Sequence, residues 1–156
     1  MRFVACVALA AAAALGVRHD HGQIHARAAG VEGLAEASAL DGSARSRAVV
    51  EALEQAGPAG LALGFEALGD PVAEVRAGGI AYLASRRSRR SVPHLIRLLR
   101  DPVPLVRRAA AVALGAIGAP QALPFLRRAM TSDDPGVAEA ALRAARRITR
   151  QADAEA

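Results

Sequence analysis

The feature that most constrains the fold is a repeat of 31 residues. Val75, Val106 and Val137 follow one another at this spacing. Other residue types share it, with prolines at 93 and 124, leucines at 83 and 114, and Asp-Pro steps beginning at 70 and 101. Agreement of several residue types on one period of roughly 20–50 residues indicates a repeat architecture, in which each unit packs against its neighbours.

Each period holds two helical patterns. From Val106 to Ile117, apolar residues recur with the spacing of a helix that has one apolar face. A second apolar stripe ends at Leu99, with Ser91 as its expected cap and Pro93 in its first turn. The short turn between the patterns makes the two helices antiparallel. Neither helix can bury its stripe alone, so we expect stacked pairs that share one core.

The composition supports the same fold class. Alanine, the strongest helix former, supplies 40 of the 156 residues, and only 3% are aromatic, which excludes an all-β fold. We predict an all-α solenoid of about 3.5 repeats over residues 29–156, in which Gly118 ends one helix and the last helix presents a polar, arginine-rich side. The expected helices cover about 30–40, 43–56, 59–69, 72–85, 91–100, 103–117, 120–131 and 135–150.

The segment SVPHLIRLLRDPVPLVRRAAAVALGAIG, residues 91–118, resembles a HEAT repeat of the short form seen in bilin-lyase-like HEAT proteins. The Val-Pro-x-Leu-Ile-x-Leu-Leu-x-Asp-Pro run and the Val-Arg-x-x-Ala step carry the resemblance, which extends over about residues 41–150. It implies a solenoid that binds other proteins, with the second helix of each pair on the concave face. It also implies a ladder between neighbouring repeats, which should stop at the last copy because Ser132 and Ala138 stand at the matching places. The ladder residues would be Asp70, Asp101, Arg76 and Arg107.

Residues 1–28 are typical of a leader with a polar linker. Phe3–Val17 is uncharged and too short for a spanning helix of about 20 residues, but it suits the apolar region of a secretory signal peptide. Ala26-Arg27-Ala28 offers a cleavage site, and earlier cleavage after Ala14 or Gly16 is the other option. We therefore expect an exported chain, periplasmic or secreted, with no stable membrane span once the leader is removed. An uncleaved anchor and a cytoplasmic chain remain as alternatives.

The charge is unevenly distributed. All 20 basic residues are arginines. Residues 29–70 hold two arginines against seven acids, a net charge of −5, whereas residues 71–156 hold fifteen arginines against seven acids, a net charge of +8. This asymmetry predicts an oriented electrostatic surface and a protein partner that carries an acidic patch. A solvated set of helix faces is the plainer interpretation.

Two sets of residues are candidates for binding. Columns at the repeat spacing, Glu66 with Arg97 and Arg128, and Leu63 with His94 and Phe125, should lie on the second helices. From them we select five partner-binding candidates for the concave face, although a solvated face, with Phe125 in the core, would explain them too. The five are Glu66, His94, Arg97, Phe125 and Arg128. The run RRSRR gives a polyanion candidate made of Arg86, Arg87, Arg89 and Arg90.

We expect a non-catalytic scaffold or adaptor that binds a protein, with no cofactor and no metal site. No phosphate-binding glycine motif, nucleophile elbow or paired-histidine motif follows residue 29, and His94 lacks a repeated catalytic partner. The histidines at 19, 21 and 25 lie in the polar linker. Binding of nucleic acid or another polyanion is the main alternative, against which stand the missing aromatic platform and the expected export. An accessory subunit of a bilin-lyase-like enzyme is an alternative by resemblance alone.

Overall fold

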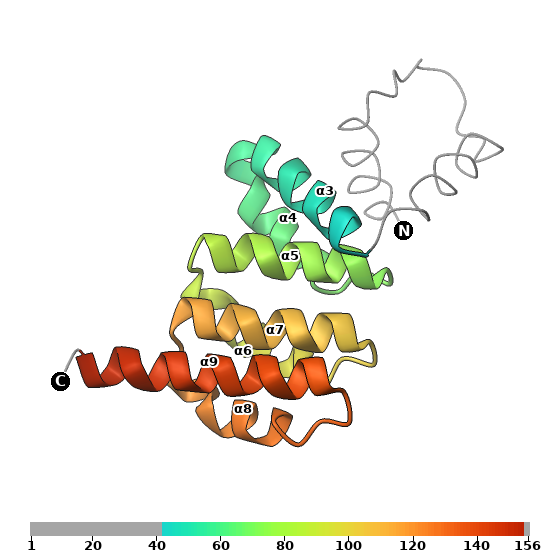
Figure 1. Ribbon diagram of the computed structural model, residues 1–156. Helices are drawn as coiled ribbons and strands as arrows, with labels where there is room; N and C mark the ends of the chain where they lie inside the picture. Colours follow the sequence, from blue (N-terminus) through green and yellow to red (C-terminus); the bar gives the residue numbers. More distant parts are fainter. Residues whose placement is uncertain (1–41, 155–156) are drawn as a thin grey trace, which may run out of the picture.

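The computed structural model describes residues 42–154, and within that range it contains seven α-helices and no strand (Figure 1). The predicted leader, the three histidines of the linker and the partial helix at 30–40 lie outside the described residues. The helices are α3 (Gly42–Gln55), α4 (Gly60–Ala67), α5 (Ala73–Ser85), α6 (Val92–Leu98), α7 (Pro104–Ile117), α8 (Leu123–Ala129) and α9 (Pro135–Ala154).

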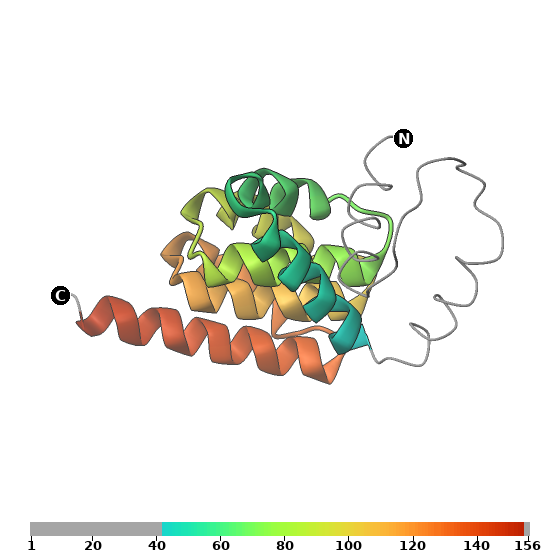
Figure 2. The same ribbon diagram turned by 90° about the horizontal axis from the view of Figure 1, so that it is seen from above.

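The helices form antiparallel pairs stacked in a row (Figure 1). The first helices of the pairs, α3, α5, α7 and α9, each pack on the next, and the second helices, α4, α6 and α8, form the other layer (Figure 2). Each second helix also packs on the first helix of the following pair, so α9 covers both α7 and α8. The predicted all-α solenoid is confirmed.

The two Asp-Pro steps, at Asp70 and Asp101, start their repeats through the same hydrogen bond. Asp70 Oδ1 accepts a hydrogen bond from the backbone N–H of Val72 at 2.8 Å, and Asp101 Oδ1 accepts one from Val103 at 2.9 Å. Pro104 then stands in the first turn of α7, where a missing N–H costs no intrahelical bond. Each carboxylate therefore turns the chain into the next helix.

The predicted ladder between repeats has one complete rung. Arg76 Nε and Nη2 donate to the two carboxylate oxygens of Asp101 at 2.9 and 2.8 Å, and both residues are buried. Arg107 repeats only the backbone part of the pattern, since its Nη1 donates to the carbonyl oxygens of Asp101 and Pro102. No carboxylate among the described residues pairs with Arg107, because Ser132 stands where the next aspartate would be. The ladder ends where the sequence predicted.

The apolar stripes of both layers meet in one core. The repeat positions Leu83, Leu114, Val106 and Val137 are all buried, and each such side chain stabilises the fold by about 1.5–3 kcal/mol. Small residues allow the first helices to approach closely. A Cβ added at Gly115 of α7 would lie 2.8 Å from the Cα of Ala144 on α9, so the two backbones are in contact there.

The second helices are shorter than predicted. Residues 89–91 and 120–122 form 3-10 turns, so α6 begins at Val92 and α8 at Leu123. Ser91 is the N-cap residue of α6, as predicted, but its side chain makes no capping hydrogen bond, because its Oγ donates instead to the carbonyl oxygen of Ser88 at 2.6 Å. Gly118 ends α7 in the left-handed conformation, with φ of 71°, as predicted.

The last helix has a polar outer side. Leu142 and Arg146 of α9 stand one period after Ala111 and Gly115, so large side chains replace the small ones that allow helix contact in α7. The predicted polar side is confirmed, since Arg143, Arg146, Arg147 and Arg150 are all exposed. Within residues 42–154, no helix has the length and hydropathy needed to cross a membrane.

Candidate functional site: the groove between α6 and α8

The predicted binding columns lie on α4, α6 and α8. Glu66, Arg97 and Arg128 are exposed, one on each second helix. Phe125 is 41% exposed, so the interpretation of Phe125 as a core residue was wrong. His94 is half-buried rather than presented to solvent. The helical period therefore predicted the outward face of α8 correctly and overestimated the exposure of His94 on α6.

A groove of about 230 Å³ lies between α6 and α8. Its apolar part comes from both helices, and two arginines and two hydroxyl residues complete its wall. Of the predicted partner-binding residues, the groove brings together Phe125 and Arg128, whereas Glu66, His94 and Arg97 lie outside its lining. The lining residues are Ile96, Leu99, Arg100, Phe125, Arg128, Ala129, Thr131 and Ser132.

Sequence reasoning missed Arg100, although the signal was present. Arg100 stands three residues after Arg97, in the turn that follows α6, and one period before Thr131. A third column at the repeat spacing would have included both residues. Leu99, the end of the predicted apolar stripe, is buried, whereas Ile96 is only half-buried. Both residues line the groove, together with Phe125 and Ala129 of α8.

His94 links neighbouring second helices. Its ring meets the ring of Phe65 on α4 edge to face, with centroids 5.6 Å apart. His94 Nδ1 is buried and has no hydrogen-bond partner among the described residues. The ring of His94 therefore packs α6 against α4.

The predicted polyanion residues lie together in the turn between α5 and α6. Arg86, Arg87, Arg89 and Arg90 are all exposed, and none pairs with a carboxylate among the described residues. The guanidinium carbon of Arg86 lies 5.2 Å from the centre of the Tyr82 ring, within range of a cation–π contact.

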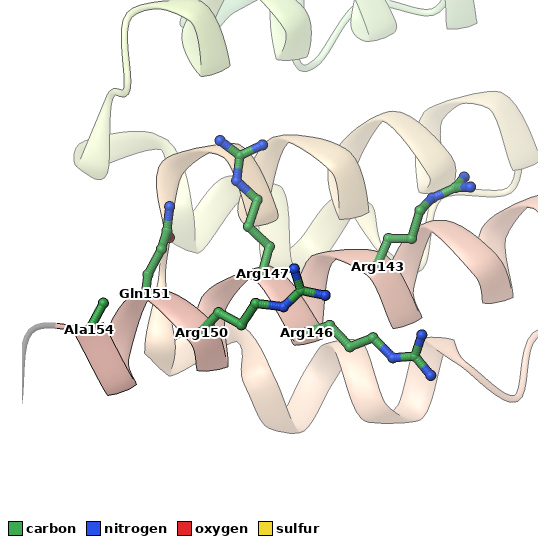
Figure 3. Close-up of a pocket in the computed structure, with 6 residues that line it drawn as sticks. All are labelled: Arg143, Arg146, Arg147, Arg150, Gln151 and Ala154. Carbon is green, nitrogen blue, oxygen red and sulfur yellow. The ribbon is translucent and has the colours of Figure 1, made fainter.

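A second group of arginines lines a hollow of about 430 Å³ on α9. Arg143 pairs with Glu139 one turn before it. Figure 3 shows Arg143, Arg147 and Gln151 on one side of α9, with Arg146 and Arg150 across its outer surface. Both features are strongly basic, and the sequence had placed most of the positive charge in this half of the chain. Within residues 42–154, no group of three or more His, Cys, Asp or Glu side chains could hold a metal ion.

Comparison with known proteins agrees with this architecture. Among solved structures, human deoxyhypusine hydroxylase in complex with glycerol is similar, with a TM-score of 0.61 and 30% sequence identity. The alignment covers 70% of this chain and 40% of the hydroxylase, so the chain spans about two fifths of that protein's length. No curated protein sequence matches the chain. The family model for HEAT repeats matches residues 61–146, which is more than half of the chain, and the chain therefore belongs to the HEAT-repeat family.

Proposed function

We propose that this HEAT-repeat chain is a non-catalytic scaffold that binds a protein partner through the groove between α6 and α8. The observation that carries the proposal is the exposure of Phe125, at 41%, in a hollow that also contains Arg100 and Arg128. Exposed aromatic and arginine side chains around an apolar depression are the residues that contribute most to binding energy at protein interfaces.

The chemistry of the groove indicates the kind of segment it would bind. Ile96, Leu99 and Phe125 offer an apolar surface, and Arg100 and Arg128 stand beside it. A guanidinium can donate two parallel hydrogen bonds to one carboxylate. The best-fitting ligand is therefore a partner segment with an apolar side chain next to an acidic residue. Arg97 on the same helix would add attraction to such a segment at longer range.

A structural role for the buried polar residues supports a non-catalytic protein. Arg76 and Asp101 pair with each other between repeats, and Ser91 bonds to the backbone of its own turn. Arg76, Asp101 and Ser91 thus contribute to holding the solenoid together. The hydroxylase activity of the similar human protein belongs to a chain of which this one spans two fifths, and our proposal does not include it.

The experiment uses the full chain immobilised as bait in extract from its native source. Captured proteins are identified, purified and titrated against wild type and two variants. Phe125→Ala should weaken a true partner about thirty-fold, as expected for loss of a central aromatic contact. Val112→Ala is the matched control, because Val112 is an exposed apolar residue on α7, 56% exposed and outside the groove, and it should leave the affinity unchanged.

A double variant tests the charges. Arg97→Glu with Arg128→Glu should also weaken binding while the helical circular dichroism stays unchanged, because both side chains are exposed. If every captured protein binds Phe125→Ala and the double arginine variant as tightly as wild type, the groove is not the binding site and the proposal fails.

A further inference from the structure

The turn between α5 and α6 is strongly basic. Its four arginines, Arg86, Arg87, Arg89 and Arg90, are exposed and have no carboxylate partner among the described residues. Four like charges within five residues repel one another, so the turn would be more stable with fewer of them. The fold itself therefore gives no reason for this concentration of charge.

The backbone of Arg87 strengthens this point. Arg87 has φ of 47°, in the left-handed region that non-glycine residues rarely adopt. One period later the same position is Gly118, with φ of 71°, which adopts the conformation without strain. An arginine thus stands where a glycine would fit the turn better. Residues held in strained conformations cluster at functional sites.

The carboxyl end of α9 brings further arginines to the same edge of the solenoid. Gln151 lies directly against Gly118 in the turn between α7 and α8, so the last turns of α9 are next to the row of interhelix turns (Figure 1). Arg147 and Arg150 are exposed there (Figure 3). We call the set of Arg86, Arg87, Arg89, Arg90, Arg147 and Arg150 the basic edge.

The basic edge lacks the groups that other classes of ligand need. None of the large apolar side chains that are exposed in the described residues belongs to it, so it has no apolar centre for a protein interface. The nearby aromatic residue Tyr82 is 2% exposed and lies beneath Arg86, so it cannot stack on a base of single-stranded nucleic acid. Binding at this edge would depend on charge, which suits a surface of dense negative charge.

The part of the chain outside the structure favours a lipid surface over duplex nucleic acid. In a chain that keeps residues 1–28 as an uncleaved anchor, the alternative to cleavage, Phe3–Val17 is an uncharged and mostly apolar segment suited to a membrane. Peripheral membrane binding typically combines one apolar element with a polybasic patch, because either element alone binds weakly. The 24 residues from 18 to 41 could span at most about 80 Å. Residue 42 is separated from the row of turns by the length of α3, about 21 Å. This linker is therefore long enough for the apolar segment and the basic edge to contact the same membrane.

We propose that the basic edge docks the solenoid onto a membrane surface rich in anionic phospholipid. The contact is peripheral, with the guanidinium groups on lipid phosphates, and it leaves the groove between α6 and α8 free. Clusters of about four to eight basic residues next to an apolar membrane element commonly bind anionic headgroups in this way.

The test measures co-sedimentation of the full chain with phosphatidylcholine vesicles, with and without phosphatidylglycerol. Wild type should bind the anionic vesicles more strongly, and the added binding should fall as salt is raised. Arg89→Ser with Arg90→Ser should lose about thirty-fold of that added binding, since each arginine at an anionic surface contributes a similar factor of about five. Binding to pure phosphatidylcholine should be the same for both chains.

The control is Arg108→Ser with Arg127→Ser, which removes the same charge from exposed residues of α7 and α8 outside the basic edge and the groove. It should keep most of the binding, because exposed charges act over only about 10 Å at moderate salt. Equal loss in the two double variants would overturn the proposal, and so would tighter binding to duplex DNA or to an acidic peptide than to anionic vesicles. The edge variant should still bind the groove's partner, so failure here is distinguishable from failure of the proposed scaffold function.

Discussion

Arg76 connects three segments of the chain through one guanidinium group. Nε and Nη2 hold the carboxylate of Asp101, whereas Nη1 donates to the carbonyl oxygens of Asp70 and Pro71 at 2.8 and 3.0 Å. Asp101 in turn accepts a hydrogen bond from the backbone N–H of Val103, the residue directly before α7. The pair therefore fixes the start of α5 against the start of α7, and it does so in a buried position where each charge depends on the other.

Replacing Arg76 by Met should lower the free energy of unfolding by roughly 3–5 kcal/mol, because the carboxylate of Asp101 would stay buried without its counter-charge. Urea denaturation followed by helical circular dichroism measures this loss. Arg143→Met is the control, since the Arg143–Glu139 pair is exposed and such pairs contribute about 0.5 kcal/mol. A loss below about 1 kcal/mol for Arg76→Met would mean that Asp101 is solvated and that the rung does not hold the repeats together.

The sequence predicted those parts of the structure that depend on period. The 31-residue spacing predicted the stacked pairs, and the resemblance to HEAT repeats added the rung between Arg76 and Asp101, including its end at Ser132. Contacts between different repeats were harder to predict from the sequence. The role of Gly115 depends on the distance from its backbone to that of Ala144, 29 residues later, and the repeat spacing does not give that distance. Periodicity shows which side a residue is on and not how far away the neighbouring helix lies.

The candidate site was predicted only in part for a related reason. Phe125 and Arg128 follow from the repeat columns, and both line the groove. Whether Ile96 is covered depends on how α8 lies against α6, which the repeat spacing does not specify. The burial of His94 similarly depends on Phe65, which lies outside the column of His94.

Gly115→Ala should destabilise the chain by about 1–3 kcal/mol, because the new methyl group would meet the backbone of Ala144 and push α7 away from α9. Thermal unfolding compares this variant with Gly69→Ala, where the nearest atom to an added Cβ is the carbonyl oxygen of Glu66 at 3.7 Å. Gly69→Ala should be neutral or stabilise by up to about 1 kcal/mol through the unfolded state. Similar melting temperatures for the two variants would show that α7 and α9 are not in close contact.

Arg87→Gly should stabilise the fold by about 0.5–1 kcal/mol. The glycine relieves a left-handed conformation that costs an L-residue about 1–2 kcal/mol, and the greater freedom of glycine in the unfolded chain offsets part of this gain. The reciprocal change, Gly118→Ala, should destabilise by about 1 kcal/mol or more, because φ at that position is 71°. Thermal unfolding measures both. Destabilisation by Arg87→Gly would mean that the Arg87 side chain supports the turn.

Export predicts a shorter mature protein. If residues 1–28 are a signal peptide, the intact mass of the protein purified from its native source should correspond to a chain that begins after Ala28, or after Ala14 or Gly16 for earlier cleavage. The chain contains one cysteine, Cys6, so every one of these cleavages also removes the thiol, and a maleimide reagent should not label the mature protein. A full-length mass with one labelled thiol would contradict export and would leave the uncleaved anchor or the cytoplasmic chain.

His94→Phe should raise the free energy of unfolding by about 1 kcal/mol. The buried Nδ1 of His94 has no hydrogen-bond partner among the described residues, and an unsatisfied buried nitrogen costs about 1–3 kcal/mol. Phenylalanine keeps the ring contact with Phe65 and is already the residue of this column in the next repeat, at Phe125. Urea denaturation of wild type and His94→Phe measures this gain in stability. Phe65→Leu is the control, because it removes the ring contact and keeps His94. If His94→Phe is less stable than wild type, Nδ1 is hydrogen-bonded in solution, and His94 then has a polar role on the second-helix face as well as a packing role.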